Sequence, residues 1–268
     1  TPDHNHAVIT MLAMKMGKHV YCQKPLTHTV YEARMITEAA KKYNVQTQMG
    51  NQGRSSDEIR SLKEWIDDDA IGKVREVFAW TDRPVGGHAW DTFAVKAMSK
   101  EKPPVPEGLD WNLWLGPAPY RPYNAHRTHG TFRGYWDYDG GGLGDMGQHY
   151  LDPVQYILGK DDELPVSVEI DADPQDIDAV GSWRRITYKY ADGTTIVLDG
   201  ENKDKSAAFI EGPEGKIFKG FKSDVKGFAE KVKSLPEPAP QVTDFHQAIR
   251  EKKKFALNEQ NGFNSCTL

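Results

Sequence analysis

A glycine-rich stretch near the middle of the chain carries the residues best suited to acid–base chemistry. It reads Gly-Gly-Gly-Leu-Gly-Asp-Met-Gly-Gln-His-Tyr-Leu-Asp over residues 140–152. Asp145, His149 and Asp152 stand at positions i, i+4 and i+7, so a helix would present all three on one face. Because a neighbouring carboxylate stabilises an imidazolium and orients the ring, such a histidine can act as a general acid or base. The alternative is a glycine-rich turn before a helix whose polar face is simply solvated.

The same stretch also satisfies the dinucleotide pattern G-x-G-x-x-G, over residues 142–147. That pattern binds pyrophosphate only when it follows a buried strand and opens a helix. Residues 135–139, Tyr-Trp-Asp-Tyr-Asp, do not form an apolar strand. Asp145 would also place a negative charge where a phosphate must meet a helix N-terminus. We therefore do not interpret this segment as a pyrophosphate site.

A lysine at the expected end of a strand is the second candidate. Lys24 follows the short strand predicted over residues 19–22, which Pro25 ends. Open α/β sheets bind ligands at the carboxyl ends of their strands. Lys24 could therefore donate a hydrogen bond to a substrate hydroxyl or a cofactor ribose; the alternative is an ordinary surface lysine. Asn51 and Arg54 follow the end of another predicted strand and are expected to face the same crevice.

The elements that would position these residues begin with one βαβ unit. The apolar run over residues 7–16 predicts a buried helix, and residues 19–22 predict a strand. Thr29 and Glu32 have capping-box spacing and begin a helix that runs to Tyr43. Residues 45–50 form the next strand. The two strands should be parallel, with a right-handed crossover.

The pattern then changes to a mostly antiparallel sheet with a few helices. The Asp-Gly pair at residues 192–193 predicts a hairpin between two strands, and a second hairpin turns at residues 212–215. Residues 84–139 are rich in Pro, Gly, Trp, Tyr and His and predict long loops. The other expected elements are helices over 57–68 and 242–252 and strands over 74–81, 166–170, 184–190, 194–198, 208–211 and 216–218.

Composition narrows the function classes. The 268 residues include 34 basic and 39 acidic ones, for a net charge of −5, which disfavours a nucleic-acid partner. No apolar run reaches the roughly 18 residues that a membrane helix needs, so no membrane insertion is expected. Cys22 and Cys266 form neither a disulfide framework nor a metal-spaced cluster. His4 and His6 lack a third ligand nearby in sequence, so no metal site is predicted.

Aromatic residues gather in the predicted loop region. They could stack on sugar rings, or they could anchor the loop against the sheet, and the sequence leaves both readings open. His126 and His129 lie in the same loop and are weaker candidates for lining a pocket. The aromatic residues are Trp111, Trp114, Tyr120, Tyr123, Tyr135 and Trp136.

Three segments in this order resemble the Gfo/Idh/MocA oxidoreductase family. Residues 1–6, Thr-Pro-Asp-His-Asn-His, look like the loop beside the nicotinamide. Residues 17–26, which contain Gln-Lys-Pro, look like the Glu-Lys-Pro segment, and residues 140–152 look like the glycine-rich Asp-x-Gly-x-His-x-x-Asp segment. The resemblance covers nearly the whole chain. Residues 111–119 and 135–138 look like a subgroup of bacterial members that are often exported, so cytoplasm and periplasm both stay open.

The resemblance implies an α/β plus α+β fold. A partial Rossmann domain, with a doubly wound parallel sheet, would occupy residues 1–53. An open, mostly antiparallel β-sheet domain with helices on one face would occupy residues 54–268 and mediate a homo-oligomer. Within it, residues 258–268 would start a helix that returns to the Rossmann domain. The first βαβ units of the family, with its phosphate-binding turn, would precede Thr1, and the family's last helix would extend past Leu268.

The implied activity is that of an NAD- or NADP-dependent oxidoreductase acting on a hydroxyl of a sugar, polyol or glycoside. Two alternatives are a redox-neutral, NAD-dependent glycoside-cleaving enzyme and a non-catalytic carbohydrate-binding or assembly protein. By position, Lys24, Asp145 and His149 would be catalytic, with His149 accepting the proton. Gln23 replaces the usual Glu, which removes a charge beside Lys24. Expected cofactor contacts are Thr1, Pro2, His6, Gln23, Lys24 and Asn51, and expected substrate contacts are Arg54, Trp136 and Asp152.

Overall fold

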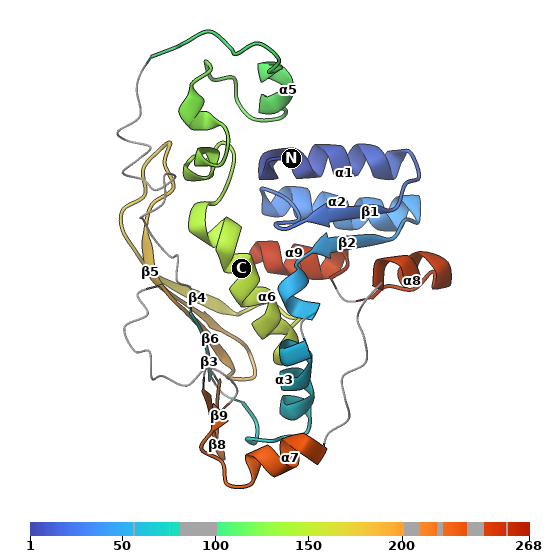
Figure 1. The fold of residues 1–268 in the computed structure, drawn as a ribbon, viewed down its shortest axis with the longest axis vertical. Coiled ribbons are helices and arrows are strands. Elements are labelled where there is room, and N and C mark those ends of the chain that lie inside the picture. Colours follow the sequence, from blue (N-terminus) through green and yellow to red (C-terminus); the bar gives the residue numbers. More distant parts are fainter. Residues whose placement is uncertain are drawn as a thin grey trace.

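The fold consists of a small parallel sheet and a large mixed sheet with helices between them (Figure 1). The structure is a computed structural model. It describes residues 1–55, 57–74, 76–80, 101–200, 210–218, 222–234, 244–255 and 257–268. In Figure 1, α6 and α3 lie between the large sheet and the block formed by the small sheet and its helices. The prediction of a Rossmann-like part followed by a mostly antiparallel sheet domain is confirmed.

The first part forms the predicted βαβ unit. Strands β1 and β2 are parallel, with Val20 paired to Thr47 and Gln23 to Gly50. The capping box that begins α2 is present: Glu32 N donates to Thr29 Oγ1 at 3.2 Å, and Thr29 N donates to Glu32 Oε2 at 2.9 Å. The elements are α1 (His6–Lys15), β1 (Val20–Gln23), α2 (Val30–Tyr43) and β2 (Thr47–Gly50).

The described residues bury helix α1 on one side, not all round as the apolar run predicted. Met14 is fully buried where α1 packs against α2 and β1. None of the described residues covers the opposite side. An apolar composition therefore placed the helix correctly but did not reveal how many of its sides are covered. Its exposed apolar residues are Val8, Ile9, Leu12 and Met16, each more than half exposed.

The second sheet has seven strands in the order β4-β5-β6-β3-β7-β8-β9. Both predicted hairpins are present: Lys189 pairs with Thr195, and Gly212 pairs with Gly215. One pair departs from the antiparallel pattern, because β3 runs parallel to β6. The strands are β3 (Glu76–Trp80), β4 (Ser167–Ala172), β5 (Trp183–Lys189), β6 (Thr195–Asp199), β7 (Ile210–Gly212), β8 (Gly215–Phe218) and β9 (Lys222–Ser223).

Helices α3 (Asp57–Asp67) and α6 (Gln148–Ile157) cover one face of this sheet. Their apolar sides form the main core with the sheet, which fixes α6 against strands β3 and β6. Apolar burial contributes on the order of 25 cal/mol per Å², so this interface holds α6 firmly. Core residues from these elements include Leu62, Val77, Leu151, Ile157, Ile186, Ile196 and Leu198.

The last helix, α9 (Glu259–Thr267), packs beside α2 and β2 rather than on the large sheet (Figure 1). Glu259 N donates to Thr47 Oγ1 at 3.0 Å, and Thr37 Oγ1 donates to Glu259 O at 3.2 Å. Helix α7 spans Phe228–Ser234. The helix expected over 242–252 is observed as α8, Asp244–Glu251, with residues 242 and 243 outside the described residues.

The predicted long loop contains a short helix, α5 (Trp111–Leu115). Asp110 caps it by accepting from Leu113 N at 2.9 Å. The aromatic residues around it anchor the segment: Trp111, Tyr123 and Tyr135 are buried in one cluster. These rings pack within the segment itself and not against the described strands of the sheet, so they hold the segment together without the predicted contact to the sheet, whereas Tyr120 and Trp136 are exposed. Residues 84–100 of this predicted loop lie outside the described residues. Among described residues, no helix is both long and apolar enough to cross a membrane.

Candidate active site

The glycine-rich stretch forms a π-helical turn, Leu143–Gly147, that leads directly into α6. Gly141 precedes it with φ 63°, and a Cβ there would lie 2.6 Å from Val180 Cγ1, so only glycine fits. A π turn holds more residues than an α turn and changes the direction of the side chains on it. Such turns occur often at functional sites. Asp145 lies within this turn, and His149 lies just after it.

Lys24 and Asp145 form the centre of the site. Lys24 Nζ lies 2.6 Å from Asp145 Oδ1 and 2.5 Å from the Asp145 carbonyl oxygen. Both side chains are mostly buried, with 12% and 14% of their surface exposed. Burial by itself raises the pKa of Asp145, but the Lys24 hydrogen bond and the Arg133 charge outweigh it, so the pKa is lowered. The pair is therefore a fixed ammonium beside an ionised carboxylate at the end of β1.

His149 lies next to this pair and is held by Asn51. His149 Nδ1 is 2.8 Å from Asn51 Oδ1, and Asn51 Nδ2 donates to Gln148 O at 3.0 Å. Burial and the positive charge of Lys24 lower the pKa of His149, against the opposing effect of Asp145. Both effects favour the neutral imidazole, which is the form that a proton acceptor requires.

Arg133 lies near Asp145, and the sequence analysis did not predict this contact. Its NH1 atom lies 3.2 Å from Asp3 Oδ2 and 3.6 Å from Asp145 Oδ1, and it bonds Asp139. Burial, then the negative charge of Asp3, raises the pKa of the fully buried Asp139 well above its usual value. The guanidinium thus balances three carboxylates. The available signal was Asp139 directly before the glycines, but no periodicity pointed to Arg133.

His6 joins the N-terminal loop to the Lys24–Pro25 segment. Its Nδ1 lies 2.7 Å from Pro25 O, and its Nε2 lies 3.2 Å from Thr1 O. Carbonyl oxygens only accept, so both ring nitrogens donate and His6 is an imidazolium. Burial opposes this charge, but the Cys22 thiol and the Pro25 carbonyl help to raise the pKa to about 9. His6 therefore positions the segment that carries Lys24, whose peptide bond to Pro25 is cis.

The remaining predicted cofactor contacts are placed differently. Thr1 is exposed and Pro2 is partly buried at the start of this loop, whereas Asn51 has no exposed surface. The side chain of Gln23 lies against Gly50, where a Cβ would meet Gln23 Oε1 at 2.5 Å. Asn51 therefore offers no surface to a cofactor in this arrangement.

Arg54 and Asp152 form a buried ion pair rather than a surface for substrate. Arg54 NH1 donates to Asp152 Oδ1 at 3.0 Å, and the two side chains are 0% and 1% exposed. A second carboxylate, Asp161, also bonds Arg54. The expectation that Arg54 and Asp152 contact substrate directly therefore needs correction, because both side chains are buried in their ion pair. The pair instead ties the end of β2 to α6.

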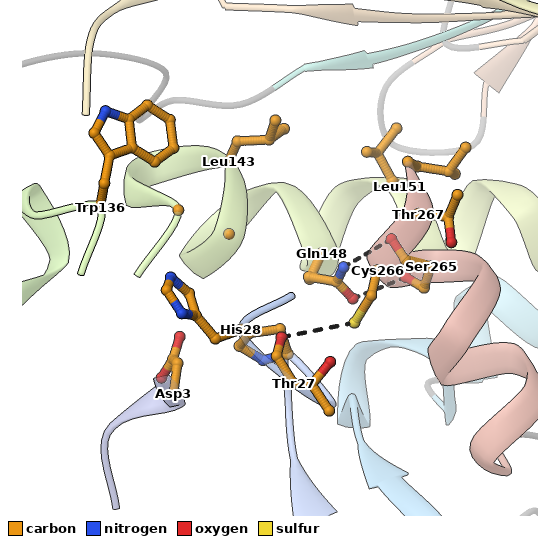
Figure 2. A pocket seen from close by; sticks show the side chains of 14 residues that line it. Asp3, Thr27, His28, Trp136, Leu143, Gln148, Leu151, Ser265, Cys266 and Thr267 are labelled. Carbon is orange, nitrogen blue, oxygen red and sulfur yellow. Dashed lines mark hydrogen bonds between the residues drawn. The ribbon is translucent and has the colours of Figure 1, made fainter. Parts of the chain in front are cut away.

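A pocket of about 270 Å³ lies on the neighbouring side of the π turn. Trp136, which is 40% exposed, lines one side of the pocket, and Gln148 lines it from helix α6 (Figure 2). His28 and Asp3 extend toward the same space from the N-terminal part (Figure 2). Lys24, Asp145 and His149 are not among its lining residues. Within the described ranges, no group of three His, Cys, Asp or Glu residues is arranged to hold a metal ion.

Comparisons with known proteins agree with this architecture. A family model described as the oxidoreductase family C-terminal alpha/beta domain (GFO_IDH_MocA_C2) matches residues 55–268. A second, described as the oxidoreductase family NAD-binding Rossmann fold (GFO_IDH_MocA), matches residues 1–51.

Individual curated relatives share limited sequence identity with this chain or match only part of it. Levoglucosan dehydrogenase of Pseudarthrobacter phenanthrenivorans is 34% identical over 74 residues, which is 28% of this chain and only 19% of that protein. Myo-inositol 2-dehydrogenase of Thermotoga maritima is 21% identical over 92% of this chain and 72% of its own length.

Solved structures share the fold. Aldose-aldose oxidoreductase from Caulobacter crescentus, complexed with glycerol, has a TM-score of 0.61 and 19% identity, covering all of this chain and 72% of that one. Levoglucosan dehydrogenase in complex with NADH and levoglucosan has a TM-score of 0.60 and 20% identity, with coverage of 99% and 73%. The family models together span nearly the whole chain, so it belongs to the Gfo/Idh/MocA oxidoreductase family.

Proposed function

We propose that the protein is an NAD- or NADP-dependent oxidoreductase that acts on a hydroxyl group of a sugar, polyol or glycoside. The observation that carries this proposal is the 2.6 Å contact of Lys24 with Asp145 near His149, whose pKa is lowered by burial and by the Lys24 charge. A base next to a fixed cation suits the removal of a proton from an alcohol. The relatives named above, which act on anhydrosugars and inositol by name, support the substrate class.

In the oxidation direction, His149 Nε2 accepts the hydroxyl proton of the substrate. Lys24 donates a hydrogen bond to the same oxygen and stabilises the negative charge that develops on it. Asp145 keeps the ammonium in place through its 2.6 Å contact and preserves its charge. In the reduction direction the same groups return the proton to the carbonyl oxygen. Arg133 keeps Asp145 ionised through its own positive charge.

The residues at the ends of β1 and β2 fit the nicotinamide end of a dinucleotide. Lys24 is a cationic donor at the carboxyl end of a parallel strand, where open α/β sheets bind such ligands. Thr1, Pro2 and Gln23 border the same end of this small sheet. When bound, the nicotinamide accepts or supplies the hydride. The π turn Leu143–Gly147 carries Asp145, whose negative charge does not suit a phosphate site.

The test is a pair of measurements on the full-length protein. Native mass spectrometry should show an increment of dinucleotide size that denaturation removes. A panel of sugars, polyols and glycosides, supplied with NAD⁺ or NADP⁺, should yield reduced nicotinamide, and His149→Gln should abolish it. Glycoside cleavage without net reduced nicotinamide would instead identify the redox-neutral route. Carbohydrate binding with neither dinucleotide nor turnover would identify a non-catalytic protein.

A further inference from the structure

We propose that Asn51 is a positioning residue that fixes the proton of the neutral His149 ring on Nδ1 and leaves Nε2 as the proton-accepting atom. This inference rests on the proposed oxidoreductase function, and it gives Asn51 a role other than the cofactor contact that the sequence suggested.

The orientation of the Asn51 amide follows from its partners. Asn51 lies 3.0 Å from the carbonyl oxygen of Gln148, which can only accept a hydrogen bond. The Asn51 nitrogen must therefore face Gln148. Its oxygen then faces His149 Nδ1, at 2.8 Å. Because that amide oxygen can only accept, Nδ1 must carry the hydrogen.

Burial removes the alternatives to this arrangement. Asn51 has no exposed surface, so water does not compete for its amide. An amide turned the other way would set its NH₂ against the ring and its oxygen against the Gln148 carbonyl, leaving two buried acceptors facing each other. Leaving a buried polar group unpaired forfeits its hydrogen bond to water with nothing in return. The observed amide orientation is therefore strongly favoured.

The segment that carries Asn51 is itself anchored to the same helix. Three residues further on, Arg54 bonds Asp152, which lies three residues after His149 on α6. The segment after β2 therefore contacts α6 through both Asn51 and Arg54. Of these two residues, Asn51 is the one that bonds the imidazole of His149. The described charged groups that act on the ring are Lys24 and Asp145, so Asn51 contributes orientation without charge.

Three substitutions separate orientation from packing. Asn51→Leu keeps the approximate volume and removes the acceptor. Asn51→Asp keeps an acceptor for Nδ1–H, loses the donor to Gln148 O and the interaction of the Asn51 amide with the buried carboxyl of Asp152, and adds a charge that raises the pKa of His149. Asn261→Leu is the control, because Asn261 is another buried asparagine, on α9, with no described hydrogen bond to His149.

The primary readout is the tautomer of His149. Full-length protein labelled with ¹⁵N-histidine is measured by NMR at a pH where the ring is neutral, and His149→Gln identifies the signals. We expect Nδ1 to be protonated and Nε2 bare in the wild type, in Asn51→Asp and in Asn261→Leu. Asn51→Leu should show a mixture containing the Nε2–H form.

Kinetics provide the second readout. Asn51→Leu should lower kcat about 10- to 100-fold with little change in KM, while Asn51→Asp should move the acidic limb of kcat/KM to higher pH. A wild-type Nε2–H tautomer, or an unchanged tautomer in Asn51→Leu, would overturn the inference. The NMR result needs no turnover. A protein with the expected tautomer but no oxidoreductase activity would therefore refute the proposed function and leave the role of Asn51 standing.

Discussion

Lys24 and Asp145 are 121 residues apart in the chain, yet the ammonium of one lies 2.6 Å from the carboxylate of the other. Lys24 follows β1 of the small sheet, and Asp145 lies on the π turn that enters α6 above the large sheet. The contact therefore joins the two parts of the fold at the candidate active site. Any change in how the two parts pack will change the geometry of the proposed chemistry.

Removing the Lys24 cation should reduce activity far more than stability. Lys24→Met removes the donor that would stabilise the developing alkoxide, so we expect kcat/KM to fall about 10²- to 10³-fold. In this variant the Asp145 carboxylate still has the Arg133 guanidinium 3.6 Å away, so the fold should lose little stability. Steady-state kinetics with a thermal melt checks this. Lys18→Met, at an exposed position before β1, is the control and should behave like the wild type. Near-normal turnover in Lys24→Met would exclude the proposed role.

The pH profile should respond to Asp145 in a definite direction. The pKa of His149 is lowered below its usual 6.5, so the acidic limb of kcat/KM for oxidation should lie below that pH. Asp145 acts against this lowering. Asp145→Asn removes the negative charge, favours the neutral ring further, and should move the limb to still lower pH while reducing the rate. A limb that moves to higher pH would show that His149 is not the group observed.

Arg133 should be important for stability because it balances buried carboxylates. Arg133→Met leaves Asp139 and Asp3 without their cation, which should lower the free energy of unfolding by about 3–5 kcal/mol. Asp139→Asn should cost only about 1 kcal/mol. The raised pKa of Asp139 reflects the cost of burying its charge, and asparagine carries none. Urea unfolding measures both, and equal losses would argue against charge balance as the role of Arg133.

The outer strand of the large sheet supports the expected homo-oligomer. β4 stands at one end of the sheet order, and Val166, Val168 and Ile170 on or beside it are 68%, 44% and 65% exposed. Exposed apolar groups on an edge strand favour pairing with a second copy. Ile170→Glu should shift the native mass toward the monomer. Leu113→Glu, at an exposed position on α5, should not. An unchanged mass for Ile170→Glu would place the interface elsewhere.

Much of the fold follows from local signals. The Thr29–Glu32 capping box and the Asp192–Gly193 hairpin turn are each encoded within a few residues, and the structure has both. The parallel pairing of β3 with β6 was not predictable in this way. Those strands are joined by more than 100 residues, and no short motif specifies their register.

In the candidate site, too, the residues with a local sequence signal were predicted and those that depend on long-range packing were not. Lys24, Asp145 and His149 were found from a strand end and from residue spacing, and the structure places Lys24 against Asp145 although a π turn replaces the expected α-helical turn. Arg133 was missed because its function depends on packing between distant segments. The predicted contact of Asp152 with substrate is not supported, because Asp152 is buried in an ion pair with Arg54, 98 residues away in the chain, which no local sequence pattern reveals.

The central claim is hydride transfer at a carbinol carbon, with His149 as the proton acceptor. The most direct test supplies the full-length protein with NAD⁺ or NADP⁺ and with sugars, polyols and glycosides deuterated at their carbinol carbons, and follows the label by mass spectrometry. The account predicts deuterium in the nicotinamide ring with the wild type and almost none with His149→Gln. Sugar turnover without label in the nicotinamide, or equal transfer by both proteins, would contradict it.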